Sequence, residues 1–239
     1  MLPCFKDPIL PEMVSIVRSE KVLSARLAKI AESTGDAGLM QLPEFQARLA
    51  FLQQMGYLDE DTAVTLKGRV ACEINSGDEI VGTEMVFCGI LNNLEPEEAV
   101  SLLSALVFQE KSECEPSLPS KLQEAKEETA ALAYRAGQQQ QEVGLANIIP
   151  EDFVKATLNF GLMEVVYEWA KGTPFNEICT LTDVMEGSIV RTIVRLDETC
   201  REFRDAARVM GNTNLYQQME DASMAIKRDI VFAASLYVS

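Results

Sequence analysis

Two arginines, Arg191 and Arg195, stand four residues apart in a segment with helical periodicity, so their side chains share one side of the predicted helix. A guanidinium group can stack on a nucleobase or donate two parallel hydrogen bonds to a phosphate. When both arginines are exposed, they repel each other by only about 0.2–0.5 kcal/mol, and a carboxylate such as Glu198 can relieve that repulsion. The spacing therefore leaves two interpretations open, a solvated helix face or a pair of arginines that lines a nucleic-acid channel.

A second candidate is the carboxylate of Glu84, which lies in the mostly uncharged segment IVGTEMVFCG of residues 80–89. Burying a carboxylate is costly unless it has a polar or charged partner. Acidic side chains on helices are usually just solvated, and neither Glu84 nor its acidic neighbours make an acid–base pair by themselves. Glu84 is therefore a candidate functional residue, but the sequence alone does not assign a chemical role to it.

The arginines belong to a long predicted helix with a narrow apolar seam. Apolar side chains recur along it at alternating steps of four and three residues, which is typical of a helix face that packs against other helices. Arg191 and Arg195 point almost directly away from this seam, and Val190 and Val194 flank them. The predicted seam consists of Ile189, Ile193, Leu196, Cys200, Phe203, Ala207 and Met210.

The residues before this helix predict a helix-turn-helix. Gly172 can adopt the left-handed conformation that ends a helix. Thr173 is the predicted cap of a short following helix, with Pro174 at its first position, where no N–H is needed. Asp183 and Glu186 have the three-residue spacing of a capping box for the long helix. This arrangement is used to bind nucleic acids and equally for plain packing.

Nearly all of the remaining chain also has helical periodicity, which predicts an all-α fold. Residues 1–56 are predicted to form an antiparallel helical hairpin, and residues 57–239 a helical bundle. A short β-turn or strand pair is expected only within residues 57–66. Further helices are expected at residues 96–110, 121–142, 150–171 and 215–236.

Composition excludes several classes of function. The chain has no histidine, which removes the Ser-His and Cys-His nucleophile systems and the commonest metal ligand. Its six cysteines are scattered without a C-x-x-C pair, as in a reduced intracellular protein, and no metal site is expected. No phosphate-binding loop or other catalytic motif occurs. No signal peptide or apolar run of spanning length is found, so no membrane partner is expected.

The net charge of −16 argues against an autonomous DNA- or RNA-binding protein, because non-specific affinity comes mainly from neutralising phosphates. Any nucleic-acid contact must be local, with most phosphate contacts supplied by another part of an assembly. A helix-turn-helix transcription factor is also disfavoured, since basic residues should flank its recognition helix. Here the later arginines of the long helix alternate with acidic residues, namely Asp197, Glu198, Glu202 and Asp205.

Four segments resemble a known family. They are LKGRVACEI (66–74), DEIVGTEMVFCGILNNLEPEEAVSLLSALVFQE (78–110), LMEVVYEWAKGTPFNEICTLTDVMEGSIVRTIVRLDE (162–198) and RDIVFAASLY (228–237). Together they are similar to the C-terminal domain of superkiller-type DExH-box RNA helicases, which are associated with the exosome. The resemblance extends from about residue 42 to the end. The amino-acid sequences of its last segments favour the cytoplasmic superkiller helicase over its nuclear relative.

The resemblance implies that residues 57–239 pack on two RecA-like motor domains and complete a ring around single-stranded RNA. The long helix is similar to the family's ratchet helix, on which Arg191 and Arg195 match positions that contact bases or phosphates. Glu84 is similar to a family glutamate that reaches the RNA. Residues 1–56 resemble the end of an arch stalk and the helix that returns from it.

The same resemblance implies a fragment without the ATP- and magnesium-binding motor domains, so no cofactor is expected here. The expected partners are single-stranded RNA, the motor domains, superkiller complex subunits and the RNA exosome, in a cytoplasmic helicase that feeds 3′–5′ decay. The leading hypothesis is a non-catalytic domain that guides RNA. The alternative is an acidic helical protein-interaction module without direct RNA contact.

Overall fold

The structure is a computed structural model that describes residues 9–34, 41–112, 114–145, 148–228 and 231. The chain divides into two compact units, residues 1–47 and 48–239, which are described separately. The helices expected for the hairpin are present as α1 (Leu10–Thr34) and α2 (Leu42–Gln54). The apolar side chains of α1 are exposed, among them Ile16 and Leu27. The pairing of these two helices into a hairpin stays a prediction.

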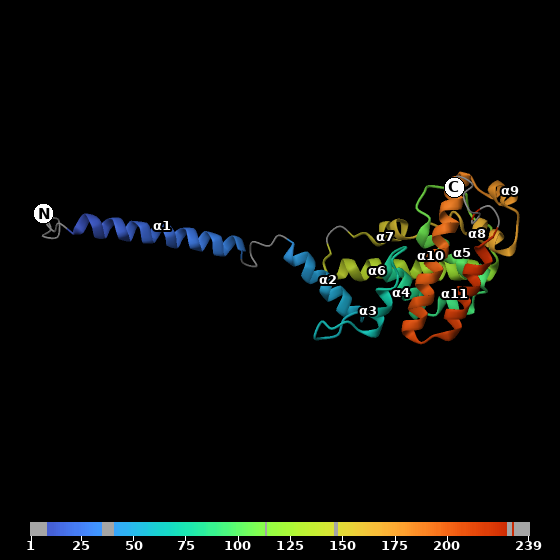
Figure 1. The fold of residues 1–239 in the computed structure, drawn as a ribbon, viewed down its shortest axis with the longest axis horizontal. Helices are drawn as coiled ribbons and strands as arrows, with labels where there is room; N and C mark the ends of the chain where they lie inside the picture. Colours follow the sequence, from blue (N-terminus) through green and yellow to red (C-terminus); the bar gives the residue numbers. More distant parts are fainter. Residues whose placement is uncertain (1–8, 35–40, 113, 146–147, 229–230, 232–239) are drawn as a thin grey trace, which may run out of the picture. The chain divides into compact units, whose positions relative to one another are not determined.

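The second unit is a helical bundle, which confirms the predicted all-α class (Figure 1). In the part of the chain that the structure describes, β structure is limited to one antiparallel bridge between Leu58 and Val64, inside the segment predicted to turn. The first helices of the bundle are α3 (Leu66–Ala71), α4 (Glu79–Phe87), the 3₁₀ helix η3 (Ile90–Asn93), α5 (Pro96–Val107) and α6 (Ser120–Glu142). They are followed by α7 (Pro150–Thr157), α8 (Met163–Lys171), α9 (Phe175–Ile178), the 3₁₀ helix η4 (Cys179–Leu181), α10 (Glu186–Met210) and α11 (Thr213–Ile226).

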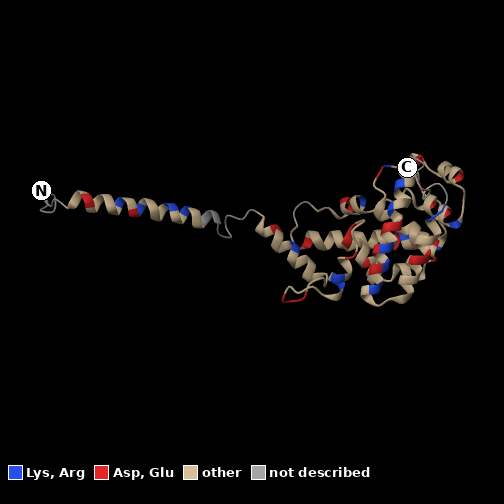
Figure 2. Ribbon diagram, in the orientation of Figure 1, with Lys and Arg blue, Asp and Glu red and all other residues tan. Residues whose placement is uncertain are grey.

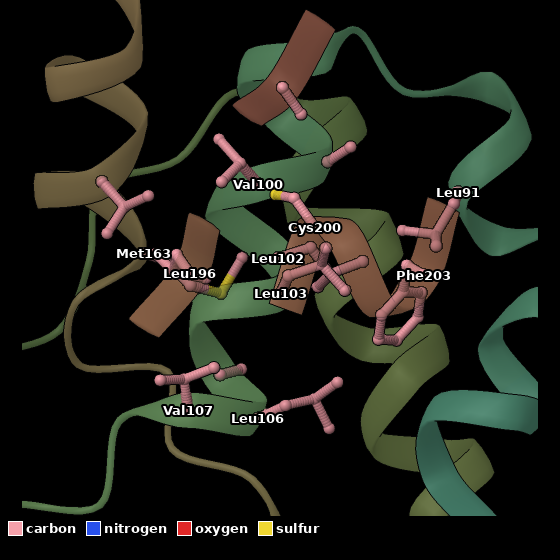
Figure 3. Packing of buried hydrophobic residues seen from close by; sticks show 14 of the residues in the cluster. Leu91, Val100, Leu102, Leu103, Leu106, Val107, Met163, Leu196, Cys200 and Phe203 are labelled. Atoms are coloured by element: carbon pink, nitrogen blue, oxygen red, sulfur yellow. The ribbon is translucent and has the colours of Figure 1, made fainter. Parts of the chain in front are cut away.

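Helix α5 lies at the centre of the bundle. Every residue from Glu98 to Val107 is buried, as expected for a helix that other elements surround on all sides. Helix α8, helix α10 and helix α11 all contact it. Figure 3 shows Leu196, Cys200 and Phe203 of α10 near Leu102 and Leu103 of α5 within this core.

One predicted helix is two helices in the structure. Residues 150–171 were expected to be continuous, but α7 ends at Thr157 and α8 begins at Met163. Asn159 explains the break, since its backbone N–H donates to Ala105 O at 2.8 Å and its side chain donates to Glu110 O at 2.6 Å. The prediction of one helix was wrong because these bonds to distant residues fix a non-helical turn.

The end of the chain departs from prediction in a similar way. Helix α11 ends at Ile226, whereas a helix to residue 236 was expected; residues 232–239 lie outside the described residues. Arg228 follows α11 with its guanidinium 3.7 Å from the ring centroid of Trp169. Its Nη2 donates to Trp169 O at 2.7 Å, and the indole Nε1 of Trp169 donates to Ile226 O at 2.9 Å. These contacts hold the end of α11 against α8.

Candidate nucleic-acid interface

The helix-turn-helix that precedes the arginines begins as predicted. Gly172 has φ = 107° and ends α8, while its N–H donates to Trp169 O at 3.1 Å. The N-cap of α9, however, is Pro174 instead of Thr173. No side-chain hydrogen bond caps α9, and the hydroxyl of Thr173 instead donates to Oε2 of Glu168 at 2.9 Å.

The predicted capping box of the long helix is wrong. Helix α10 begins at Glu186 with Met185 as its N-cap, and no side chain caps it. Asp183 therefore lies two residues too early to act as the cap. One of its carboxylate oxygens instead accepts the hydroxyl of Ser112 at 2.7 Å, which ties the loop after α5 to the turn before α10.

The predicted apolar seam of α10 is confirmed. Its residues from Ile189 to Ala207 are fully buried, and Met210 at the end is half-buried. This burial against α5 and α11 fixes the rotation of the helix about its axis. The side opposite the seam is consequently exposed, with Val194 at 44% exposure between the two arginines.

Arg191 and Arg195 are both exposed on that side, but their surroundings differ. Nη2 of Arg191 lies 3.3 Å from Oε1 of Glu110 and donates to Oγ of Ser188 at 2.9 Å. The hydroxyl of Ser188 itself donates to the same Glu110 oxygen at 2.7 Å. Arg195 forms no ion pair or side-chain hydrogen bond with the residues that the structure describes. Its guanidinium is therefore open to an external anion.

The contact with Glu110 was not predicted. This residue lies 81 positions before Arg191 in the sequence, just after α5, and only the fold brings the two together. A single glutamate at the end of a predicted helix gives no pattern that could have identified it.

Glu84 occupies a separate place in the bundle. Its carboxylate forms an ion pair with Lys67 and accepts the Tyr57 hydroxyl at 2.8 Å. Lys67 also donates to Met55 O at 2.9 Å, next to the end of α2. Burial, and then the negative charge of Glu84, raise the pKa of the Tyr57 hydroxyl, so it stays a hydrogen-bond donor. Glu84 therefore has the partners that its burial demands.

The structure does not join the three candidate residues into one cluster. Within the described residues, no hydrogen bond or ion pair links Glu84 to Arg191 or Arg195. Figure 2 shows basic and acidic residues interspersed along the helices of the bundle. The arginine pair can donate hydrogen bonds to phosphates and offer flat surfaces for stacking, whereas Glu84 holds α3, α4 and the end of α2 together.

Other kinds of site find no support in the described part of the chain. No group of three or more Cys, Asp or Glu side chains there is placed to hold a metal ion. None of the helices described is long and apolar enough to cross a membrane.

Comparisons with known proteins agree on one family. Residues 61–233 match the DSHCT (NUC185) domain. The chain is 52% identical over 96% of its length to the DExH-box ATP-dependent RNA helicase DExH11 of Arabidopsis thaliana, and covers 17% of that protein. It is 42% identical to human Superkiller complex protein 2, over 98% of the chain and 18% of that protein. It is 37% identical to the human Exosome RNA helicase MTR4, over 99% of the chain and 23% of that protein.

The chain thus spans about a fifth of the length of these relatives. The match covers most of the bundle, including both candidate arginines and Glu84. The chain belongs to the DSHCT domain family, the C-terminal domain of superkiller- and Mtr4-type DExH-box RNA helicases.

Proposed function

We propose that this chain is a non-catalytic part of an ATP-dependent RNA helicase and that the exposed side of α10 contacts single-stranded RNA. The observation that carries the proposal is the absence of an ion-pair partner for Arg195 among the described residues, on a side of α10 that the buried seam turns outward. In a chain with a net charge of −16, an unpaired arginine on a rigid helix offers an anion a local contact. The names of the relatives, which are RNA helicases, supply the class of anion.

Arg191 has a different part in this proposal. Arg191 contacts both Glu110 and Ser188, so its positive charge is offset by the carboxylate of Glu110. The result is a hydrogen-bonding surface without net charge beside Val194. Such a surface suits a sequence-tolerant wall that touches bases and sugars, while motor domains elsewhere in the protein supply most phosphate contacts. Glu84 remains part of the proposal only as a residue near which RNA could pass, because its carboxylate already has two partners.

The same proposal extends to the motor domains and partners of the whole helicase. The RecA-like motor domains would bind ATP and magnesium, and this bundle would pack on them and guide RNA toward exosome decay with superkiller subunits. The higher identity to human Superkiller complex protein 2 than to human MTR4 supports a cytoplasmic superkiller-type helicase. A Schizosaccharomyces pombe mtr4 is also 42% identical, so fluorescence microscopy of the tagged protein is the direct test of location.

Ultraviolet crosslinking of single-stranded RNA to the full-length polypeptide, mapped by peptide mass spectrometry, tests the RNA contact. Crosslinks within residues 187–195 are expected. Crosslinks confined to the motor domains would contradict the proposal and leave the bundle as a structural support. Crosslinks near Glu84 would extend the proposed RNA-contacting surface to the cavity of about 330 Å³ that Glu84 lines together with Arg135 and Gln139.

The alternative function is an acidic protein-interaction module without RNA contact. The pairing of Arg191 with Glu110 favours it, because an exposed ion pair of this kind is an ordinary feature of a solvated surface and needs no further ligand. Salt-sensitive binding of a basic protein, combined with the absence of crosslinks on α10, is the result that would select this alternative.

A further inference from the structure

A groove lies where the turn after α2 meets α3 and the start of α4. Its volume is about 480 Å³, and most of its lining is apolar, including Leu52, Leu58, Val64, Ala71, Ile74 and Ile80. Val64 at its edge is 56% exposed, so the second unit itself does not cover the groove. An exposed apolar depression of this kind is a feature of interaction sites.

Among the described side chains that line the groove, the one charged group is acidic, namely Glu79. The ammonium of Lys67 lies over the ring of Tyr57, which also lines the groove, but it is paired with Glu84. The tight turn between Leu58 and Val64 carries Asp59, Glu60 and Asp61, all exposed. None of these four carboxylates forms an ion pair with the residues that the structure describes, although Oδ1 of Asp59 accepts the backbone N–H groups of Asp61 and Ala63 within the turn. Their negative potential is therefore available to a partner.

We propose that this groove docks a short segment of a separate protein in which an apolar side chain is flanked by lysines or arginines. The apolar side chain would fill the depression, and the basic residues would meet Glu79 on one side and the acidic turn on the other. Interfaces commonly combine an apolar centre with a complementary charged rim, which raises the association rate and selects the partner. This proposal does not depend on RNA contact by α10.

The groove contains a natural reporter. Cys72 lines it and has an exposed side chain. Cys88 is also exposed but lines the separate cavity with Lys67 and Arg135, where the nearby charges include two cations. The two thiols therefore compare an acidic groove with a partly basic one inside the same molecule.

Disulfide exchange with synthetic peptides tests the proposal on the full-length polypeptide. Three peptides of equal length each carry one cysteine as a mixed disulfide with thiopyridine, so that attack by a protein thiolate forms the new disulfide and releases thiopyridone. Their sequences contain a leucine flanked by lysines, the same leucine flanked by glutamates, and an alanine flanked by lysines. Mass spectrometry measures the labelling of Cys72 and Cys88. We expect the lysine–leucine peptide to label Cys72 about tenfold more than the alanine peptide, since burying most of a leucine side chain is worth roughly 1.4 kcal/mol or more.

The contribution of charge to peptide binding can be measured separately, through its dependence on salt. The preference of Cys72 for the lysine–leucine peptide over the glutamate–leucine peptide should shrink between 50 mM and 500 mM salt, as screening lengths shorten. The double substitution Asp61→Asn and Glu79→Gln should reduce that preference. Glu124→Gln and Glu128→Gln, at two exposed acidic residues on α6, make the same change in net charge elsewhere and should leave the preference intact.

Three outcomes would overturn the proposal. Equal labelling by all three peptides would show that the groove selects neither apolar nor basic groups. A Cys72 that reacts with no peptide and with no small thiol reagent would show that another part of the same polypeptide covers the groove. Protection of Cys72 that grows with protein concentration would assign the groove to a second copy of the chain.

Discussion

Nη2 of Arg191 lies 3.3 Å from Oε1 of Glu110, whereas Arg195, one helical turn further along α10, has no such partner among the described residues. The two arginines that the sequence makes equivalent are therefore unequal in the fold. A guanidinium already paired with a carboxylate gains less from a phosphate, because the phosphate must compete with or tolerate the carboxylate.

Arg195→Ala is accordingly expected to weaken RNA binding by the full-length protein more than Arg191→Ala. We expect about a fivefold to tenfold loss for Arg195→Ala, in the range of a single lost stacking or phosphate contact, and about twofold for Arg191→Ala. Fluorescence anisotropy with single-stranded RNA at several salt concentrations measures both values. If Arg195 meets a phosphate, its removal should also lower the salt slope by about 0.7.

Arg208→Ala is the matched control for this pair. Arg208 is an exposed arginine on α10 that pairs with Asp205 at 3.3 Å, so its removal makes the same change in net charge. An equal loss of RNA affinity in Arg195→Ala and Arg208→Ala would mean that only total charge matters and that α10 has no specific contact.

Glu84→Gln is expected to lower stability instead of acting mainly on RNA. Glutamine keeps the size of the side chain but leaves Lys67, whose side chain is 19% exposed, without its counter-charge. We expect a loss of about 1–3 kcal/mol in the free energy of unfolding, measured by urea denaturation. Tyr57→Phe removes one hydrogen bond to the same carboxylate and should cost about 1 kcal/mol.

RNA crosslinking to α10 distinguishes the two roles of Glu84. It should be unchanged in Glu84→Gln at temperatures where the variant is folded. A variant of normal stability with weaker RNA crosslinking would instead support the role that the family resemblance gives to Glu84.

The sequence predicted what depends on neighbouring residues along the chain. The seam of α10 and the left-handed Gly172 follow from local periodicity and from the conformational freedom of glycine. What it missed depends on residues far apart in the sequence. Asn159 interrupts a helical pattern because it bonds to residues near the end of α5, and Asp183 bonds to Ser112 instead of capping α10.

The candidate site likewise has features that the sequence predicts and features that only the fold determines. The helix and the direction of Arg195 could be predicted from the seam, but the pairing of Arg191 with Glu110 could not. Periodicity describes which side of a helix is buried, and it carries no information about which distant loop lies over the exposed side.

Acid should weaken the contact between α10 and α11 through Asp197. This carboxylate is 3% exposed and accepts bonds from Ser223 at 2.6 Å, from Lys227 at 2.7 Å and from Arg201. Burial by itself would raise the pKa of Asp197, but the hydrogen bonds from Lys227, Ser223 and Arg201 together bring it below the ordinary value. In an unfolded chain the group titrates near its ordinary pKa of about 3.9.

A folded pKa below the unfolded pKa means that the unfolded state binds the proton more readily. The stability that Asp197 contributes is therefore complete above about pH 4–5 and is lost as the pH falls through the folded pKa. Asp197→Asn should cost about 1–3 kcal/mol at pH 7 and should make the variant less sensitive to acid below pH 4 than the unchanged protein. Urea unfolding at pH 7, 4 and 3 measures this, with the exposed Asp221→Asn as control; parallel acid losses in all three proteins would contradict it.

Gly68→Ala should disturb the wall of the groove at α3. A Cβ atom at residue 68 would lie 2.4 Å from Tyr57 O and 2.7 Å from Cγ1 of Val64, so the turn would have to move away from α3. We expect a loss of about 1–3 kcal/mol in the free energy of unfolding, as in other cases of forced overpacking. Gly187→Ala in the first turn of α10 is the matched control, because its Cβ would meet nothing within 4 Å and alanine favours the helix by up to about 1 kcal/mol. Equal stability changes for the two substitutions, measured by thermal unfolding, would mean that the turn yields freely and that the groove has no fixed shape.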